Sequence, residues 1–362
     1  MEALKNLFNE NFVKNFASCI KKYSSSFDEE LYLYLVLKHL ETLELKARMR
    51  LISSKIRSCL KADYGESCEI LKLVKEDFFK EKTTSLQAMV LADFVEVYGL
   101  EHFDVSMNAL ETFTIDSSSE FAVREFILKD EQKAMDYFYK WAKNSNEHIR
   151  RLASEGCRPR LPWAIALPSF KKDPTLIFSI LDELKNDESS YVRRSVANNL
   201  NDISKDNPIL VLSFIEKNIG SNKQCDSLLK HAARTLLKKG DVKTLELFGY
   251  RKIDALILND FILDSKVCIG EHLNFSFELE NKTTLGLLRV EYEIDFQMAN
   301  DKRSKKIYMI SQSEVKANKK LINKKHSFKM ITTRKYYLGI HFITLIVNGI
   351  KIQTKEFLLT KP

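Results

Sequence analysis

Apolar residues recur at helical spacing over the first two thirds of the chain. Near the N-terminus they fall at i, i+3 and i+4, as on one face of an amphipathic helix: Leu4, Leu7, Phe8, Phe12, Phe16 and Ile20. The same period predicts helices over residues 31–39, 43–60, 68–79, 85–98, 102–113, 119–128, 131–142, 209–218, 226–239 and 242–248. Ser117, Ser118 and Ser119 are candidate N-caps, which would place Glu120 in the first turn of its helix.

A self-similar segment lies in the middle of this region. Residues 149–153 (IRRLA) and 192–196 (VRRSV) share an apolar and basic pattern at an offset of 43 residues. An offset of roughly 40–47 residues is typical of HEAT-like helix pairs that stack into a solenoid. Apolar residues line one side of both copies, which predicts burial of that side, and basic residues gather on the other.

The period changes from 3.6 to 2 at about Tyr250. Alternating apolar and polar residues predict strands around 273–280 and 290–297, and the apolar runs 340–347 and 350–359 flank Asn348-Gly349, a strong hairpin signal. Several short strands suggest an immunoglobulin-like β-sandwich, without the inter-sheet disulfide of antibody domains because Cys268 is its single cysteine. We therefore predict a mainly α protein: a HEAT-like α-helical repeat solenoid over residues 1–252, followed by a smaller all-β immunoglobulin-like sandwich over residues 253–362.

Charge is unevenly placed along the chain. The net charge is +8, and residues 255–362 hold 18 Lys and Arg against 11 Asp and Glu, whereas residues 1–254 are nearly balanced. This asymmetry favours a polyanionic partner for the C-terminal region, although a charge that serves only solubility would look the same. Six cysteines without a C-x-x-C pair, and no run near the ~18 apolar residues of a membrane helix, suggest a reduced protein of the bacterial cytoplasm.

Four segments together form a specific signature: SEFAVREF at 119–126, RRLASEGCRPRLPWA at 150–164, YVRRSVANNLNDISKDNP at 191–208 and KHAARTLLKKG at 230–240. Through them the chain resembles the AlkC family of DNA alkylation-repair glycosylases, relatives of AlkD built from HEAT-like repeats. Some members carry a C-terminal immunoglobulin-like domain, which fits the predicted sandwich. Glu125 departs from the family pattern, where proline is expected.

The resemblance implies hydrolytic, monofunctional excision of cationic methylated bases from duplex DNA: 3-methyladenine, 3-methylcytosine and 1-methyladenine. It also implies that the base does not swing into a deep pocket, unlike in most glycosylases. Carried over residue by residue, it assigns the catalytic site to Glu120, Arg151, Glu155, Trp163 and Asp202, with Phe121 beside it as a DNA contact.

Carboxylates suit this chemistry. An N-alkylated base is positively charged and already a good leaving group, so the barrier lies in the sugar, which develops oxocarbenium character. Fixed carboxylates stabilise that charge, and one of them can orient the attacking water. Glu120 and Glu155 are the candidates, and Asp202 is a third. Each could instead be a capping or surface carboxylate, and for Asp202 the two interpretations carry nearly equal weight.

Arg151 and Trp163 also allow two interpretations. Arg151 is four residues before Glu155, so the two form either a surface ion pair worth ~0.3–0.5 kcal/mol or a functional pair in which Arg151 tunes the carboxylate and contacts phosphate. Trp163 lies between Pro162 and Pro168, which disfavour a long helix there. It either packs in the core or stacks on the lesion or sugar.

Basic residues predict where DNA lies. Matching positions of a solenoid line one face, which makes a phosphate-tracking row of Arg158, Arg160, Arg193, Arg194, Lys230 and Arg234. We expect about half of them to contact DNA and the others to be solvated or paired. Lys305 and Lys306, in loops or edge strands of the sandwich, are expected to grip DNA from the opposite side, so that the sandwich would complete a clamp.

Two functions besides the enzyme stay open: a non-catalytic HEAT-like DNA-binding scaffold and a protein–protein scaffold. The carboxylate–tryptophan set favours an enzyme, because a pure phosphate binder gains nothing from Glu120 and Glu155 beside DNA. We expect no metal and no other cofactor, and no lysine is marked as a Schiff-base nucleophile for strand cleavage. We expect a monomer acting on duplex DNA.

Overall fold

The computed structural model describes residues 3–79, 85–299, 302–331 and 334–361. The chain divides into two compact units, one of residues 1–211 with 220–232 and the other of residues 212–219 with 233–362. The first unit is helical, and the second holds both β-sheets. The predicted domain boundary at residue 252 stays a prediction.

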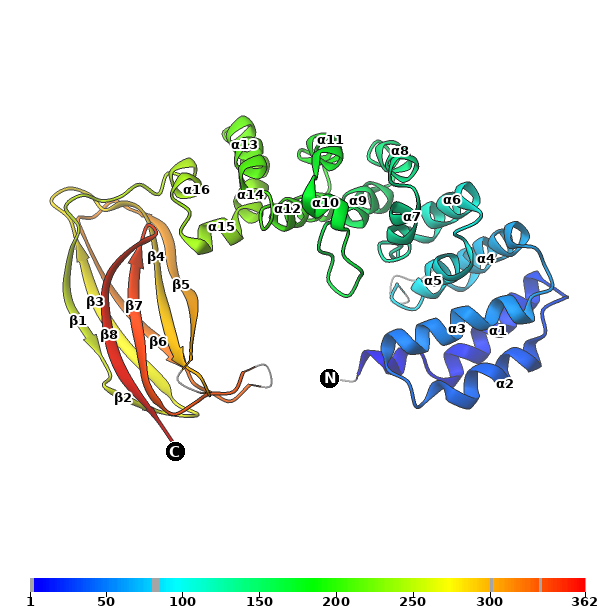
Figure 1. The fold of residues 1–362 in the computed structure, drawn as a ribbon, viewed down its shortest axis with the longest axis horizontal. Coiled ribbons are helices and arrows are strands. Elements are labelled where there is room, and N and C mark those ends of the chain that lie inside the picture. Colours follow the sequence, from blue (N-terminus) through cyan, green and yellow to red (C-terminus); the bar gives the residue numbers. More distant parts are fainter. Residues whose placement is uncertain (1–2, 80–84, 300–301, 332–333, 362) are drawn as a thin grey trace. The chain divides into compact units, whose positions relative to one another are not determined.

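The described helical elements follow one another in the order of Figure 1. They are η1 (Leu4–Leu7), α1 (Glu10–Tyr23), α2 (Glu29–Leu40), α3 (Leu45–Cys59), α4 (Tyr64–Phe78), α5 (Met89–Tyr98), α6 (Phe103–Phe113), α7 (Val123–Lys129), α8 (Glu131–Trp141), α9 (Glu147–Gly156), α10 (Pro168–Lys172), α11 (Thr175–Leu184), α12 (Ser190–Ile203), α13 (Pro208–Asn218), α14 (Lys223–Ala232), α15 (Arg234–Lys239) and α16 (Val242–Leu247). The mainly α prediction is confirmed.

Two predicted helix boundaries are wrong. Helix α7 begins at Val123, so Glu120 lies in the turn before the helix and not in its first turn. The N-cap residue of α7 is Ala122, without a side-chain cap. Ser119 Oγ donates to the carbonyl of Leu110, whereas Ser118 Oγ donates to the Glu120 carboxylate and accepts from the Glu120 backbone nitrogen in the preceding turn. The predicted helix 226–239 is two helices, α14 and α15, which are separated by a turn at Ala233.

Helices α9 and α12 are the two copies of the self-similar segment. Each carries its first arginine at the matching position, and Arg150 and Arg193 both donate from Nη1 to the backbone carbonyls six and five residues earlier in the chain. The arginine thereby fastens its helix to the preceding loop. Helix α12 packs between α9 and α14, and α11 covers α9 and α12 (Figure 1).

The second unit contains two sheets. The strands are β1 (Ile257–Leu263), β2 (Lys266–Cys268), β3 (His272–Glu280), β4 (Gly286–Gln297), β5 (Arg303–Val315), β6 (Lys319–Ser327), β7 (Gly339–Val347) and β8 (Ile350–Thr360). The sheet orders are β1-β3-β6 and β2-β8-β7-β4-β5. Strands β7 and β8 form the predicted hairpin, in which Asn348 (φ 46°) and Gly349 (φ 80°) both adopt the left-handed backbone of a type I′ turn.

Lys305 and Lys306, expected in loops or edge strands of this unit, lie on an edge strand. Lys305 and Lys306 are exposed on β5, the edge of the five-stranded sheet, and β6, the edge of the three-stranded sheet, carries further lysines. Lysines on an edge strand oppose pairing with another chain's strand, so this position also has a structural explanation. None of the described helices is long and apolar enough to cross a membrane.

A buried histidine makes the β unit sensitive to pH. His326 is 7% exposed, and its Nδ1 lies 2.8 Å from the hydroxyl of Tyr292. Burial, and then the charges of Arg334 and Lys306, lower the pKa of His326 to about 4. The unfolded chain, with a histidine pKa of about 6.5, takes up this proton at higher pH than the folded chain. The neutral His326 therefore leaves the free energy of unfolding undiminished above pH ~6.5, and this free energy falls as the pH drops from 6.5 towards 4.

Replacing His326 by phenylalanine should remove that part of the pH dependence. Between pH 7 and 4.5 the His326→Phe variant should lose about 2–3 kcal/mol less free energy of unfolding than wild type, measured by urea unfolding at each pH. The control is His272→Gln, at an exposed position on β3. Parallel pH profiles for wild type and His326→Phe would contradict this prediction.

Candidate active site

Glu120, Arg151 and Glu155 meet where the turn before α7 packs against α9. Arg151 Nη1 lies 2.5 Å from Oε2 of Glu120, and its Nη2 lies 3.5 Å from Oε1 of Glu155. Ser118 Oγ donates to the same Oε2 at 2.6 Å. The side chains of Arg151 and Glu155 are 14% and 7% exposed, so the alternative of a surface ion pair is wrong.

The chain of charges continues into α12. Arg158 donates from Nη1 to Oε1 of Glu155 at 2.6 Å, and from Nε to Oδ2 of Asp202 at 2.8 Å. Lys205 donates to the other oxygen of Asp202, and Ser195 to the other oxygen of Glu155. We call Glu120, Arg151, Glu155, Arg158 and Asp202 the carboxylate network. All three predicted catalytic carboxylates belong to it.

Burial and pairing act against each other on the network's arginines. Burial alone would lower the pKa of Arg151, but the charges of Glu120 and Glu155 outweigh it and raise this pKa above its usual value. Likewise, Glu155 and Asp202 outweigh burial and raise the pKa of Arg158. Both arginines therefore stay cationic and hold the carboxylates at set positions.

The three carboxylates differ in how fully they are hydrogen-bonded. Both oxygens of Glu155 and both of Asp202 accept a donor from the protein. Glu120 accepts through Oε2, whereas its Oε1 has no donor within the part of the chain that the structure describes. Glu120 also lines a hollow of about 530 Å³. It is therefore the carboxylate best placed to receive a hydrogen bond from a molecule outside the protein.

Aromatic and imidazole groups line the same hollow. The guanidinium of Arg151 stacks over the ring of Tyr191, 5.0 Å from its centroid, and His148 lies edge-on to that ring. His148 Nε2 is 3.4 Å from Oδ1 of Asp116. Tyr191 therefore supports the face of Arg151 while Glu120 and Glu155 hold its edge.

Trp163 is on a loop of residues 159–167, which we call the tryptophan loop. Its side chain is 69% exposed, so the alternative that it packs in the core is wrong. Its backbone is left-handed (φ 66°), which is uncommon for a bulky residue. Lys46 of α3 donates to the Trp163 carbonyl at 2.7 Å and lies over the ring of Phe121. This contact links the tryptophan loop to the residue next to Glu120.

Arg158 and Arg193 of the predicted phosphate row both bond to groups of the protein itself. Arg158 is 7% exposed and divided between Glu155 and Asp202, so it belongs to the carboxylate network and not to a phosphate-binding surface. Arg193 is partly engaged with the carbonyls that precede its helix. The sequence pattern shows that these residues are cationic but not how far they are buried or paired.

The other four members lie outside the carboxylate network. Arg160 forms a two-pronged pair with Asp206, at 2.9 and 2.6 Å. Arg194 is exposed in a second hollow, of about 640 Å³, between α12 and α14. Lys230 is half-buried on α14, and Arg234 begins α15 in the second unit.

The second hollow repeats the first one. Arg194 follows Arg151 by the 43-residue offset, and Ser190 follows Glu147, which lines the first hollow, by the same offset. The carboxylates are not repeated: the position of Glu155 becomes Asn198, and the second hollow adds Lys223 and His231. No acidic residue is among its described lining residues. The first hollow is thus lined by both acidic and basic side chains, whereas the charged side chains that line its neighbour are basic.

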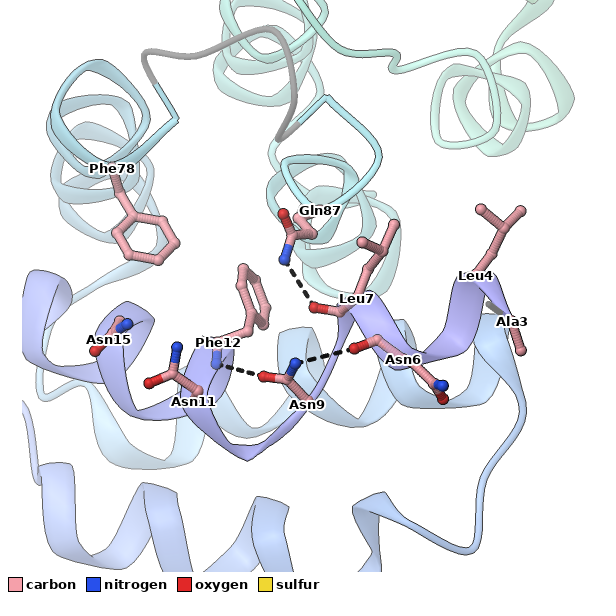
Figure 2. Close-up of a pocket in the computed structure, with 10 residues that line it drawn as sticks. All are labelled: Ala3, Leu4, Asn6, Leu7, Asn9, Asn11, Phe12, Asn15, Phe78 and Gln87. Atoms are coloured by element: carbon pink, nitrogen blue, oxygen red, sulfur yellow. Dashed lines mark hydrogen bonds between the residues drawn. The ribbon is translucent and has the colours of Figure 1, made fainter. Parts of the chain in front are cut away.

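A third hollow, of about 500 Å³, lies on the N-terminal helices (Figure 2). Figure 2 shows two of its amide side chains bonded to the backbone: Asn9 Oδ1 accepts from the nitrogen of Phe12, and Gln87 donates to the carbonyl of Leu7. Its lining is made of amide and apolar side chains, namely Ala3, Leu4, Asn6, Leu7, Asn9, Asn11, Phe12, Asn15, Phe78 and Gln87. This hollow does not fit carboxylate chemistry.

The sequence did not single out several residues that support the site. Tyr191 is inside the quoted signature, but its stacking on Arg151 depends on how α9 and α12 pack. Ser195 lies beside the apolar side of α12, and its hydroxyl donates a hydrogen bond to Glu155. Lys46 is 117 residues from Trp163, and no local pattern connects them.

Comparisons with known proteins agree with this architecture. Residues 48–236 match the DNA alkylation repair enzyme family, which covers more than half of the chain. The chain belongs to that family. Residues 258–361 match a family described as the C-terminal Ig-like domain of the uncharacterised protein YhaZ. YhaZ of Bacillus subtilis (strain 168) is 41% identical over 352 residues, which are 96% of this chain and 97% of YhaZ.

A solved structure extends the comparison to the whole fold of this DNA alkylation repair family member. Pseudomonas fluorescens alkylpurine DNA glycosylase AlkC, bound to DNA containing an abasic site analog, matches with a TM-score of 0.93 and 34% identity, over 99% of this chain and 100% of that chain. The predicted resemblance to AlkC and the predicted order of helical repeats and β domain are confirmed. Among the described residues, no group of three or more His, Cys, Asp or Glu side chains is arranged to hold a metal ion.

Loss of the buried Arg158 should lower the free energy of unfolding much more than loss of the more exposed Arg160 nearby. Arg158→Met leaves Glu155 and Asp202 buried without their shared cation, which should cost about 3–5 kcal/mol in the free energy of unfolding. Arg160→Met breaks only the more exposed pair with Asp206 and should cost at most about 1 kcal/mol. Urea unfolding of both variants compares the two, and equal losses would contradict the burial argument.

Proposed function

We propose that this protein is a DNA glycosylase that hydrolyses the N-glycosidic bond of cationic N-alkylated bases in duplex DNA. The proposed substrates are 3-methyladenine, 3-methylcytosine and 1-methyladenine. Two observations support this: the family membership, with AlkC as an alkylpurine DNA glycosylase of the same fold, and the position of Glu120. The single observation that carries the proposal is a carboxylate clamped on one oxygen and open on the other, at the edge of a hollow.

Glu120 is the proposed catalytic carboxylate. Arg151 and Ser118 hold its Oε2, so the carboxylate is pre-oriented before substrate arrives and needs little rearrangement. Its Oε1 can accept a hydrogen bond from the attacking water, and its charge stabilises the oxocarbenium-like sugar. The alkylated base leaves as a neutral molecule and needs no general acid.

The other members of the carboxylate network have supporting roles in this proposal. Glu155 and Asp202 are fully hydrogen-bonded, so they supply negative charge and hold the arginines, without receiving the water themselves. Arg151 holds Glu120 in position through their ion pair. Trp163, exposed on the tryptophan loop, would stack on the lesion or sugar, and an aromatic face also attracts a cationic partner.

The proposed DNA partner would be held mainly by phosphate contacts. Arg194, with Lys223 and His231 in the second hollow, offers cationic and hydrogen-bonding groups to the backbone of the duplex. Phe121 is half-buried beside Glu120, and Arg160, Lys230 and Arg234 stay in the proposal as further DNA contacts. In this proposal the base stays in the duplex during the reaction. The protein acts as a monomer, and its glycosylase domain is residues 1–252.

Replacing Glu120 should stop the reaction without preventing binding. Glu120→Gln keeps the shape but loses the charge, and should slow release of 3-methyladenine from methylated duplex DNA by about 10²–10³-fold. Glu155→Gln should also slow release, and it should lower stability because Arg158 and Arg151 lose a partner. Base release is measured by chromatography and DNA affinity by fluorescence anisotropy.

The control for both is Glu101→Gln, whose side chain is 86% exposed and pairs with Lys129. It should release base at the wild-type rate. If wild type binds methylated DNA but releases no base, the carboxylates are structural and the protein is a DNA-binding scaffold.

We also propose that Lys305 and Lys306 contact the DNA backbone. The double substitution of both lysines by serine should weaken binding at low salt and reduce the slope of log affinity against log salt by about 1–2. The control is Lys319→Ser on β6, whose ammonium is 3.0 Å from a carboxylate oxygen of Glu280, so that its charge is already paired within the protein. An unchanged salt slope in the double variant would exclude these two lysines as phosphate contacts.

A further inference from the structure

We infer that Arg124 is a positioning residue, which acts through Trp163 by holding the tryptophan loop in the geometry that the reaction uses. This inference rests on the proposed glycosylase function and adds to it a residue that contacts neither the hollow nor the DNA. It is carried by the hydrogen bonds of Arg124, by its burial, and by the backbone conformation of Trp163.

Arg124 is completely buried on α7, and its guanidinium binds backbone carbonyls. Nη1 donates to Gly156 at 3.0 Å and to Arg158 at 2.8 Å, and Nε donates to Ile165 at 2.7 Å. Gly156 is the last residue of α9, where a cation also interacts favourably with the negative end of the helix. One side chain therefore ties together α7, the end of α9 and the tryptophan loop.

Burial of the Arg124 guanidinium in the core is energetically costly. No carboxylate hydrogen-bonds to it, its Nη2 is buried without a partner in the described residues, and burial lowers the pKa of Arg124 to about 10. A buried cation without an ion pair is a poor source of stability, and apolar residues of similar volume often serve better. A buried arginine of this kind is explained if it fixes the position of one segment relative to another. Here it would fix the tryptophan loop relative to the segment that carries Glu120, four residues before Arg124.

The conformation of the tryptophan loop depends on contacts that fix its position. Its two ends are anchored by the buried side chains of Leu161 and Leu167, and a backbone bond joins Leu167 to Pro159. Trp163 between them is exposed and left-handed, a conformation that persists only when its surroundings impose it. The bonds that impose it from outside the loop are those of Arg124 to Ile165 and of Lys46 to Trp163.

The test is a double-mutant cycle in the full chain. Arg124→Lys keeps the charge but loses the fork that spans three carbonyls, and should slow base release about 10–100-fold through misplacement of the loop. In a Trp163→Ala background the same substitution should cost less than about threefold, because the group through which it acts is gone. Equal losses in both backgrounds would mean that Arg124 acts only on the fold, and would overturn the inference.

A second readout does not need activity. Trp141 and Trp163 are the two tryptophans of the chain, and Trp141 is buried. In a Trp141→Phe background, time-resolved fluorescence anisotropy reports on Trp163 alone, and Arg124→Lys should increase its fast local motion. Unchanged anisotropy would overturn the inference. If the wild-type protein releases no base, the proposed function fails, whereas this measurement still decides whether Arg124 orders the loop.

Lys46→Met gives a variant that should fold, because the Lys46 side chain is exposed. It removes the bond to the Trp163 carbonyl and should raise the motion of Trp163 as well, by less than Arg124→Lys. The matched control is Lys129→Met, which removes an exposed lysine-to-carbonyl bond of the same length, to Leu100. Should Arg124→Lys fail to fold, a Lys46→Met variant with unchanged anisotropy would overturn the role of these external bonds.

Discussion

The site depends on one physical constraint: a carboxylate withdrawn from water must be paired. Glu155 and Asp202 are 5% and 2% exposed, and Arg158 between them supplies the charge that makes this burial tolerable. Arg151 then extends the alternation to Glu120, at the edge of the hollow. The network thereby fixes the position of Glu120 relative to the buried helices. The remaining oxygen of Glu120 is the proposed acceptor for the attacking water.

The helical repeat explains why the network and the basic hollow are neighbours. Helices α9 and α12 carry an arginine at equivalent positions, and in both copies the preceding arginine fastens the helix to its loop. Carboxylates that the second copy lacks surround Arg151, whereas Arg194 shares its hollow with lysine and histidine. The same scaffold thus presents two adjacent surfaces of different chemistry, which suits a partner that has a phosphate backbone beside a cationic base.

Much of the fold followed from periodicity, and part of the site followed from the quoted signature. The 43-residue offset identified α9 and α12, and Asn348-Gly349 identified the β7–β8 hairpin, because both signals are local. The predicted phosphate row did not separate the buried Arg158 from the more accessible arginines, because a pattern of basic residues does not show which of them are buried or paired. Glu120 lies in the turn before its helix, where Ser118 bonds both its backbone nitrogen and its carboxylate, and the run of serines alone did not show this arrangement.

The sequence by itself determined the helical period, the change to strands near residue 250 and the identities of the three carboxylates and the tryptophan. These depend on side-chain type and spacing, which are properties of neighbouring residues. Tertiary structure decided which oxygen of Glu120 stays open, that Trp163 is exposed and not in the core, and that Lys46 and Arg124 reach the tryptophan loop. Contacts across 41 and 117 residues form only when helices pack, so burial and partner choice are set by the packed fold and not by local spacing.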